Sequence, residues 1–309
     1  MIARAIVSFA LLAAASGSAQ ALIFRAYVSA QGNDADPCTL AQPCRLLPAA
    51  LAAVADGGEI WMLDSANYNT STVTIAKSVT ILAIPGAVGS IVAVNGGAAI
   101  SITASLLQVA LRNVAIVPVA GATPGTHGVE MTNVQSTLTI ERSLIAGMPE
   151  DGVHVGNFGT LVVADSVMRN NAGWAVSLQT SASAVVSSTR MIDNYGGVLV
   201  NGFGVSGGSH ASVVDCVISG GGYGVGAYAI GATARVSVSR STIDRTNTAL
   251  SATTDGTGTA EVNFGDSLVA GNFYAWYQAG AGSAVLSLLN NQLSRNGLTQ
   301  GSKTPLGMQ

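Results

Sequence analysis

Charged and aromatic residues are scarce in this chain. Of its 309 residues only 9% are charged and 5% aromatic, whereas ordinary soluble domains carry ~25% charged residues. The 13 Lys and Arg residues are outnumbered by 16 Asp and Glu residues, and no basic run is present, which argues against nucleic-acid binding. Apolar residues make up 49% and glycine contributes 37 residues, which excludes a disordered chain. This composition is typical of repetitive β structure.

The first residues have the pattern of a secretory signal peptide. Arg4 precedes an apolar run over residues 5–15, and a small-x-small cleavage motif ends at Ala21. The apolar run is shorter than the ~18 residues that span a bilayer, so we expect cleavage rather than a membrane anchor. The sequence therefore predicts a signal peptide over 1–21 and a mature chain from Leu22 with no membrane span. The expected location is secreted or periplasmic.

The chain has 3 cysteines. Cys38 and Cys44 each follow a proline and lie close together in sequence, so an exported protein would close this loop with a disulfide. A metal site there would need further ligands close by, and none is present. Cys216 stands at a repeat position otherwise held by Ser, Thr or Asn, and is expected to be a small buried thiol. No metal ion or cofactor is expected.

One pattern recurs seven times from about residue 138 onward. A small polar residue, here called position zero, returns every 23 to 27 residues. An apolar residue lies three positions before it and another lies two positions after it in every copy, from Ile140 and Ile145 to Leu288 and Leu293. The position-zero residues are Ser143, Ser166, Thr189, Cys216, Ser241, Ser267 and Asn291. Alternating apolar residues open each copy, which indicates a half-buried strand.

A second strand follows in most copies, introduced by Gly or Ala. Corner glycines are assigned at Gly128, Gly152, Gly173 and Gly197, and the first and third residues after each are expected to point inward. This assignment places Trp174 in the core. Short strands in units of about 25 residues, without helical period, predict a parallel β-helix with coils ~4.8 Å apart. Leucine-rich and calcium-binding nonapeptide repeats fit less well, because their consensus residues are missing.

The N-terminal region is less regular. Residues 48–55 begin with proline and are rich in alanine, which predicts a short helix that caps the first coil. Strands are expected at 27–29, 59–63, 73–75 and 79–84. We therefore expect an all-β fold, with one parallel β-helix domain over 22–300 that includes this cap. A loose tail is expected over 301–309.

The N-terminal segments carry a resemblance to a known family. They are Tyr27-Val28-Ser29, Gly32-Asn33-Asp34, Pro37-Cys38, Pro43-Cys44-Arg45, Ala49-Ala50-Leu51 and Gly57-Gly58-Glu59-Ile60. Together with the repeats, they make roughly residues 25–300 similar to exported bacterial right-handed β-helix proteins of the pectate-lyase-like superfamily. The resemblance implies right-handed winding and an extended polysaccharide lying along one face. The catalytic segments of polygalacturonases and pectate lyases are absent from this sequence.

Two of the 3 histidines fall in one group. His127 and Asp151 precede the corner glycines of two consecutive coils, and Glu130 and His154 are the middle residues of the strands that follow. The expected register places Glu130 over His154 and His127 over Asp151, with all four side chains facing solvent. Such a patch can perform general acid–base chemistry or orient a metal ligand. The alternative is a polar surface ladder without a cleft.

Three tyrosines form the second candidate site. Tyr274 and Tyr277 are expected to face outward on the same side as the His and Glu residues, with Trp276 pointing inward. Tyr223 joins Tyr274 from two coils away. Exposed aromatic rings offer rigid apolar faces for stacking on sugars. They can equally cover the end of the solenoid against solvent or another chain.

Three functions remain open at this level. The first is an exported β-helix without catalytic activity that binds carbohydrate or acts at the cell surface, because no catalytic signature is present. The second is a polysaccharide lyase or glycoside hydrolase that uses Glu130, His154, Asp151 and His127. The third is a structural or adhesive rod that self-associates.

Overall fold

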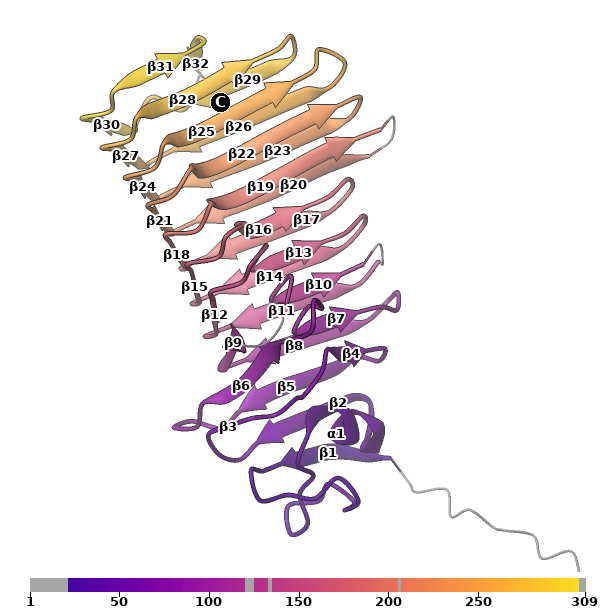
Figure 1. Ribbon diagram of the computed structural model, residues 1–309. Coiled ribbons are helices and arrows are strands. Elements are labelled where there is room, and N and C mark those ends of the chain that lie inside the picture. The colour runs from indigo at the N-terminus through magenta and orange to yellow at the C-terminus, as the bar shows by residue number, and fades with distance from the viewer. Residues whose placement is uncertain (1–21, 120–124, 133–134, 205–206, 306–309) are drawn as a thin grey trace, which may run out of the picture.

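The computed structural model describes residues 22–119, 125–132, 135–204 and 207–305. Three parallel sheets wind into a right-handed solenoid of about 9 turns. Successive coils stack in chain order from the N-terminal to the C-terminal end (Figure 1). The predicted all-β parallel β-helix is therefore confirmed. The segment assigned to a signal peptide lies outside the described residues, and no helix of the described residues is long and apolar enough to cross a membrane.

From β2 onward, each coil contributes one strand to each sheet in the order A, B, C. Sheet A contains β1 (Ile23–Val28), β2 (Val54–Met62), β5 (Val79–Ala83), β8 (Gln108–Arg112), β11 (Thr137–Glu141), β14 (Thr160–Ala164), β17 (Ser183–Ser187), β20 (Gly208–Val214), β23 (Thr233–Ser239), β26 (Thr259–Gly265), β29 (Ser283–Ser287) and β32 (Lys303–Pro305). Sheet B contains β3 (Ala66–Asn67), β6 (Gly89–Ala93), β9 (Val114–Pro118), β12 (Leu144–Ala146), β15 (Val167–Arg169), β18 (Arg190–Ile192), β21 (Val217–Ser219), β24 (Thr242–Asp244), β27 (Leu268–Ala270) and β30 (Gln292–Ser294). Sheet C contains β4 (Val73–Ile75), β7 (Ile100–Ile102), β10 (Val129–Met131), β13 (Val153–Val155), β16 (Trp174–Leu178), β19 (Gly196–Phe203), β22 (Tyr223–Ile230), β25 (Thr248–Thr254), β28 (Tyr274–Ala279) and β31 (Leu298–Gln300).

The apolar repeat positions form continuous columns inside the solenoid. In sheet B, Ile145 pairs with Met168, and the column continues through Met191 to Ile218, all of them buried. The equivalent column of sheet A runs from Ile140 to Phe264 and is also buried. Burial of each branched side chain contributes about 1.5–3 kcal/mol, so this shared interior holds the coils together.

The polar repeat positions form hydrogen-bonded ladders at the corners. At position zero, the backbone N–H of Ser143 donates to Oγ of Ser166 at 3.1 Å, and that of Cys216 donates to Oγ of Ser241 at the same distance. These bonds satisfy N–H groups that the turn removes from the sheet. Cys216 is buried as expected, and this burial raises the pKa of its thiol.

A second ladder of asparagines lines the corner that leads into sheet C. Oδ1 of Asn194 accepts from both the backbone N–H and Nδ2 of Asn171, at 3.1 and 2.8 Å. Nδ2 of Asn194 donates to the carbonyl oxygen of Met168 at 3.0 Å. Both asparagines are buried, so their side chains replace solvent as hydrogen-bond partners of the turn.

The N-terminal cap is confirmed, with corrected bounds. Helix α1 (Leu47–Ala53) buries Leu47, Ala50 and Leu51 against the first coil. It ends before the predicted residue 55 because Val54 is extended and begins β2. The expected disulfide between Cys38 and Cys44 is present beside it, with Cα atoms 4.6 Å apart.

The C-terminal end departs from two predictions. Residues 303–305 of the segment expected as a loose tail form β32, which pairs with β29. Leu288 does not continue the sheet A column, because the register pairs Phe264 with Ser287 and leaves Leu288 38% exposed. Leu293 keeps its register with Val269 but is 40% exposed in the last coil. The interior therefore opens at this end of the described chain.

Candidate functional site

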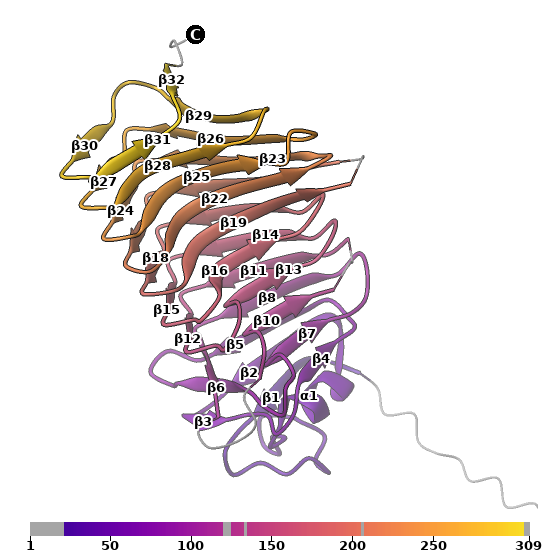
Figure 2. The same ribbon diagram turned by 45° about the horizontal axis from the view of Figure 1, so that its top comes forward.

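Two ladders of side chains run along the outside of sheet C. The middle ladder contains Glu130, His154, Ser177, Leu199, Gly226, Ser251 and Tyr277. The corner ladder lies three residues earlier in each coil and contains His127, Asp151, Trp174, Gly196, Tyr223, Thr248 and Tyr274. The strands that carry them follow one another along the solenoid axis (Figure 2). Both sets of sequence-predicted site residues therefore lie on one face.

The histidines and acids of this face form a group that we call the polar cluster (His127, Glu130, Glu150, Asp151 and His154). Hydrogen bonds or ion pairs join four of them, and Glu130 is the neighbour of His154 on the middle ladder. Nδ1 of His154 donates to Oδ2 of Asp151 at 3.0 Å. The backbone N–H of Asp151 donates to Nδ1 of His127 at 3.2 Å. This acceptor role leaves the proton of neutral His127 on Nε2, which lies 3.1 Å from Oε2 of Glu150.

The imidazoles lie close together and are partly buried. Their ring centroids are 4.7 Å apart in a stacked arrangement. The His127 side chain is 13% exposed, and burial, followed by the nearby charge of His154, lowers its pKa. The His154 side chain is 24% exposed, and its Nε2 has no hydrogen-bond partner among the described residues. His154 is thus an imidazole oriented by a carboxylate, with its second nitrogen directed away from that carboxylate.

The register of the four predicted polar residues is confirmed, and His127 contacts Asp151 as expected, but the carboxylate partner of His154 differs from the expected one. Glu130 pairs with His154 along the ladder, as predicted. The carboxylate that contacts His154 is nevertheless Asp151, from the corner of the same coil. Oδ1 of Asp151 also accepts the backbone N–H of Trp174 at 2.8 Å, which fixes its orientation. The sequence did not reveal this contact within one coil.

The polar cluster also contains the donor atoms of a metal site. Among the described residues, one group of three ligand residues could hold an ion, and it comprises His127, Asp151 and His154. One donor atom from each lies within 4.8 Å of the others. Two imidazoles and one carboxylate are donors that suit zinc and related transition metals.

Next to the polar cluster lies an aromatic cluster (Trp174, Tyr195 and Tyr223). Trp174 stacks on Tyr223 with ring centroids 5.5 Å apart, and meets Tyr195 edge-on at 5.9 Å. A Cβ atom at Gly196 would overlap the Trp174 ring. The ring therefore lies across the outside of the next coil. The prediction that Trp174 belongs to the core is wrong.

The error comes from the position of the corner. Ala175, and not Gly173, takes the place held by Gly152 and Gly197 in neighbouring coils, since the carbonyl of Ala175 lies against Gly152. Ala175 is buried at the corner, and the residue before it in the chain, Trp174, lies on the corner ladder outside. The spacing in the sequence could have identified Ala175 as the corner residue. Ala175 follows Ser166 by nine positions, and Gly152 follows Ser143 by the same number.

A shallow hollow of about 230 Å³ lies beside the aromatic cluster. Its lining consists of Trp174, Tyr195, Leu199, Tyr223, Gly226, Ala227, Tyr228, Ser251 and Thr253. None of these residues is charged at neutral pH. Burial, together with the neighbouring Tyr195, raises the pKa of Tyr223 and keeps its hydroxyl protonated. The hollow thus combines apolar ring faces with neutral hydroxyl groups.

Tyr274 and Tyr277 form a smaller aromatic group two coils beyond Tyr223. Their ring centroids are 6.1 Å apart, and Phe273 meets Tyr274 edge-on at 4.9 Å. Both tyrosines are half-buried on the two ladders. Trp276 packs against the core between them, as predicted.

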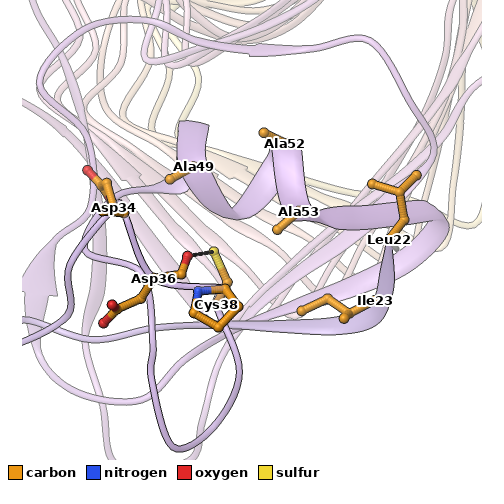
Figure 3. Close-up of a pocket in the computed structure, with 10 residues that line it drawn as sticks. Leu22, Ile23, Asp34, Asp36, Cys38, Ala49, Ala52 and Ala53 are labelled. Atoms are coloured by element: carbon orange, nitrogen blue, oxygen red, sulfur yellow. Dashed lines mark hydrogen bonds between the residues drawn. The ribbon is translucent and has the colours of Figure 1, made fainter. Parts of the chain in front are cut away.

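A separate hollow of about 220 Å³ lies at the N-terminal cap, far along the chain from both clusters. It is bounded by α1, the start of β1 and the loop that carries Asp34, Asp36 and Cys38 (Figure 3). Oδ1 of Asp34 accepts the backbone N–H groups of Arg45 and Leu46, both at 2.8 Å. Asp34 therefore orders the entry to α1.

Solved structures with the same architecture are carbohydrate-active enzymes by name. Pectate lyase Pel9A has a TM-score of 0.64 at 14% identity, over 92% of this chain and 80% of that chain. Alginate lyase from Paenibacillus sp. str. FPU-7 has a TM-score of 0.64 at 14% identity, over 91% and 99%. Polygalacturonase from Erwinia carotovora ssp. carotovora has a TM-score of 0.55 at 11% identity, over 84% and 90%. These likenesses show the fold.

At the sequence level, no curated protein matches the chain. The family model described as "Right handed beta helix region" matches residues 60–243 and 127–297. Those matches cover most of the solenoid, and the three stacked sheets agree with them. The chain therefore belongs to the right-handed β-helix family, with the pectate-lyase-like architecture.

Proposed function

We propose that this protein binds an extended polysaccharide along the outside of sheet C. The observation that carries the proposal is the aromatic cluster, whose stacked rings border a hollow lined by uncharged residues. Apolar ring faces with polar edges suit sugars, which combine C–H faces with hydroxyl groups. The architecture shared with proteins named as pectate lyase, alginate lyase and polygalacturonase supports a polysaccharide as the partner.

The ladders set the direction of the bound polymer. Coils stack ~4.8 Å apart, and Trp174 and Tyr223 lie two coils apart on the corner ladder, with Gly196 between them. The two rings therefore offer contacts at two levels along the axis. Tyr274 and Tyr277 continue the same ladders two coils further on. A polymer that lies along the axis can contact both aromatic groups, whereas a small sugar contacts one of them. We therefore expect affinity to increase with chain length.

The charges of this face favour an uncharged polymer. The described strands of sheet C contain neither Arg nor Lys. The acidic residues Glu130, Glu150 and Asp151 lie beside the aromatic cluster and would repel the carboxylates of a polyuronate. We therefore propose a neutral polysaccharide, in contrast to the anionic pectate and alginate in the names of two structural neighbours.

Affinity electrophoresis of the metal-free full chain tests this proposal. The gels contain a neutral polymer (xylan, galactomannan or mixed-linkage β-glucan) or an anionic one (polygalacturonate or alginate). We expect retardation by a neutral polymer that Trp174→Ala reduces at least tenfold. Phe24→Ala, an exposed aromatic on β1, is the matched control and should bind like the wild type. Absence of retardation by every polymer would refute the proposal, and retardation by polyuronates alone would refute its charge argument.

We further propose that the protein is exported to a secreted or periplasmic location. The signal-like pattern over 1–21 and the Cys38–Cys44 disulfide support this location, since disulfides persist in oxidising compartments. Fractionation of the producing cell, followed by N-terminal sequencing, tests it. We expect a mature chain that begins at Leu22, and a cytoplasmic chain that retains Met1 would contradict this.

A polysaccharide lyase or hydrolase is the second candidate function. The contact between His154 and Asp151, at 3.0 Å, favours it because a carboxylate-oriented imidazole is suited to proton transfer. The test compares release of reducing ends and unsaturated products by the wild type and His154→Ala. Equal release by both proteins would remove the polar cluster from the chemistry.

A further inference from the structure

We propose that His127, Asp151 and His154 bind one divalent transition-metal ion of the zinc type. This site goes beyond polysaccharide binding, which depends on the aromatic cluster. It also departs from the sequence-based expectation that the protein has no metal ion. Histidine nitrogen and carboxylate oxygen together form the donor set that proteins use for zinc, iron(II) and cobalt(II).

The donor atoms are close to the spacing that such an ion requires. Nδ1 of His154 lies 3.0 Å from Oδ2 of Asp151, and Nδ1 of His127 lies 3.9 Å from the same oxygen. Ligands at about 2.0–2.1 Å from a tetrahedral zinc are roughly 3.3 Å apart. A side-chain rotation that closes the longer of these two separations by about half an ångström would bring it to this spacing. One donor atom from each of the three residues already lies within 4.8 Å of the others.

The outer contacts of the cluster have the arrangement found around metal ligands. Metal-bound histidines commonly donate their other ring N–H to a carboxylate, which fixes the ring and its tautomer. Nε2 of His127 has this partner in Glu150, at 3.1 Å. The backbone N–H of Trp174 holds Oδ1 of Asp151 at 2.8 Å and leaves Oδ2 directed at both histidines.

The protonation of the two rings allows both histidines to bind a metal ion through Nδ1. Nδ1 of His127 is already unprotonated, since it accepts the backbone N–H of Asp151. Metal binding at this nitrogen breaks that hydrogen bond, because the ring nitrogen has a single in-plane lone pair. Nδ1 of His154 carries a proton in its bond to Asp151. Metal binding moves this proton to solvent or to Nε2 of the same ring, which has no partner among the described residues.

Local charge favours a divalent cation, and the donor types favour a transition metal over calcium. Three carboxylates (Glu130, Glu150 and Asp151) surround the two imidazoles. Calcium takes 6–8 oxygen ligands, whereas Asp151 is the only carboxylate in the proposed donor set. We therefore expect selectivity for zinc-type ions, with the remaining coordination positions open to water beside Trp174.

Isothermal titration of the metal-free full chain with Zn²⁺ tests the site. We expect one equivalent to bind to the wild type, and at least a tenfold weaker affinity in His154→Ala. His210→Ala is the matched control, because His210 is exposed on β20 in sheet A. This control should bind Zn²⁺ within twofold of the wild type, and Ca²⁺ at the same concentration should not compete.

Co²⁺ supplies a second measurement that does not depend on activity or on glycan binding. We expect visible absorption bands of imidazole-bound Co²⁺ in the wild type and their loss in His154→Ala, with unchanged circular dichroism. Absence of a Zn²⁺ equivalent in the wild type would overturn the proposal, as would unchanged Zn²⁺ affinity in His154→Ala. Retention of glycan affinity after chelation would leave the proposed polysaccharide function intact in either case.

Discussion

The asparagine ladder provides a prediction of stability that can be worked from the structure. In Asn194→Ala, the backbone N–H and Nδ2 of Asn171 lose their shared acceptor, and the carbonyl oxygen of Met168 loses a donor. These atoms lie inside the corner, where Asn171 is 2% and Asn194 3% exposed. A buried donor without a partner costs about 1–3 kcal/mol. For two donors, with partial entry of water, we expect a loss of about 2–4 kcal/mol.

Urea denaturation followed by circular dichroism measures this loss, and hydrogen exchange of the Asn171 amide locates it. Asn170→Gly is the control, because Asn170 is exposed with a left-handed backbone (φ 56°) that glycine also adopts. The control should remain within about 0.5 kcal/mol of the wild type. A similarly small effect in Asn194→Ala would show that the ladder does not stabilise the solenoid.

Two further predictions concern Gly196, beside the aromatic cluster, and Asp64, which follows β2. Gly196→Ala places a Cβ in the Trp174 ring, so we expect weaker retardation in glycan gels with an unchanged circular dichroism spectrum; wild-type retardation would contradict this geometry. For Asp64, burial favours the neutral acid, but hydrogen bonds to its carboxylate from the Tyr68 and Ser29 hydroxyls and the Ala30 backbone N–H prevail and lower its pKa. Its contribution to stability is therefore present above pH 3.8 and lost as pH falls below it. In thermal unfolding, Asp64→Asn should be destabilised at neutral pH and match the wild type in acid, whereas a constant difference would refute this sign.

The period of the repeat made most of the fold predictable. Position zero needs a small side chain whose oxygen or sulfur can accept an N–H from the preceding coil, as Ser166 does for Ser143 and Cys216 does for Thr189. The corner glycines Gly128 and Gly152 give the register of the second strand, which brings Glu130 beside His154. The neighbours along the two ladders of the polar cluster were therefore predictable from this periodicity.

Tyr223 was predicted as a site residue, but the outward direction of Trp174 was not, because two small residues compete for one corner. The sequence pattern favours Gly173 as the corner residue, but this position is glycine because a Cβ there would lie 2.7 Å from the carbonyl carbon of Glu150. Ala175 fills the corner instead, which reverses the direction expected for Trp174. The misprediction of Leu288 has a different cause. The paired residues Phe264 and Ser287 are one position closer in sequence than the position-zero residues Ser267 and Asn291 of the same two coils.

Contacts within the site could be predicted only in part. Register determines which residues are neighbours on a ladder, but rotamers determine which atoms meet. His154 therefore bonds to Asp151 of its own coil, although the ladder places Glu130 beside it. The tautomer of His127 likewise depends on the backbone N–H of Asp151, which the sequence pattern does not reveal.

Trp174 itself can report on whether sheet C holds a polysaccharide. The chain has 3 tryptophans, so a variant with Trp61→Phe and Trp276→Phe leaves Trp174 as the single fluorophore. Titration with the neutral polymer that retards the wild type should shift its emission in a saturable manner, at the affinity found by electrophoresis. An unchanged Trp174 emission at saturating polymer would contradict the proposal that this face is the binding surface.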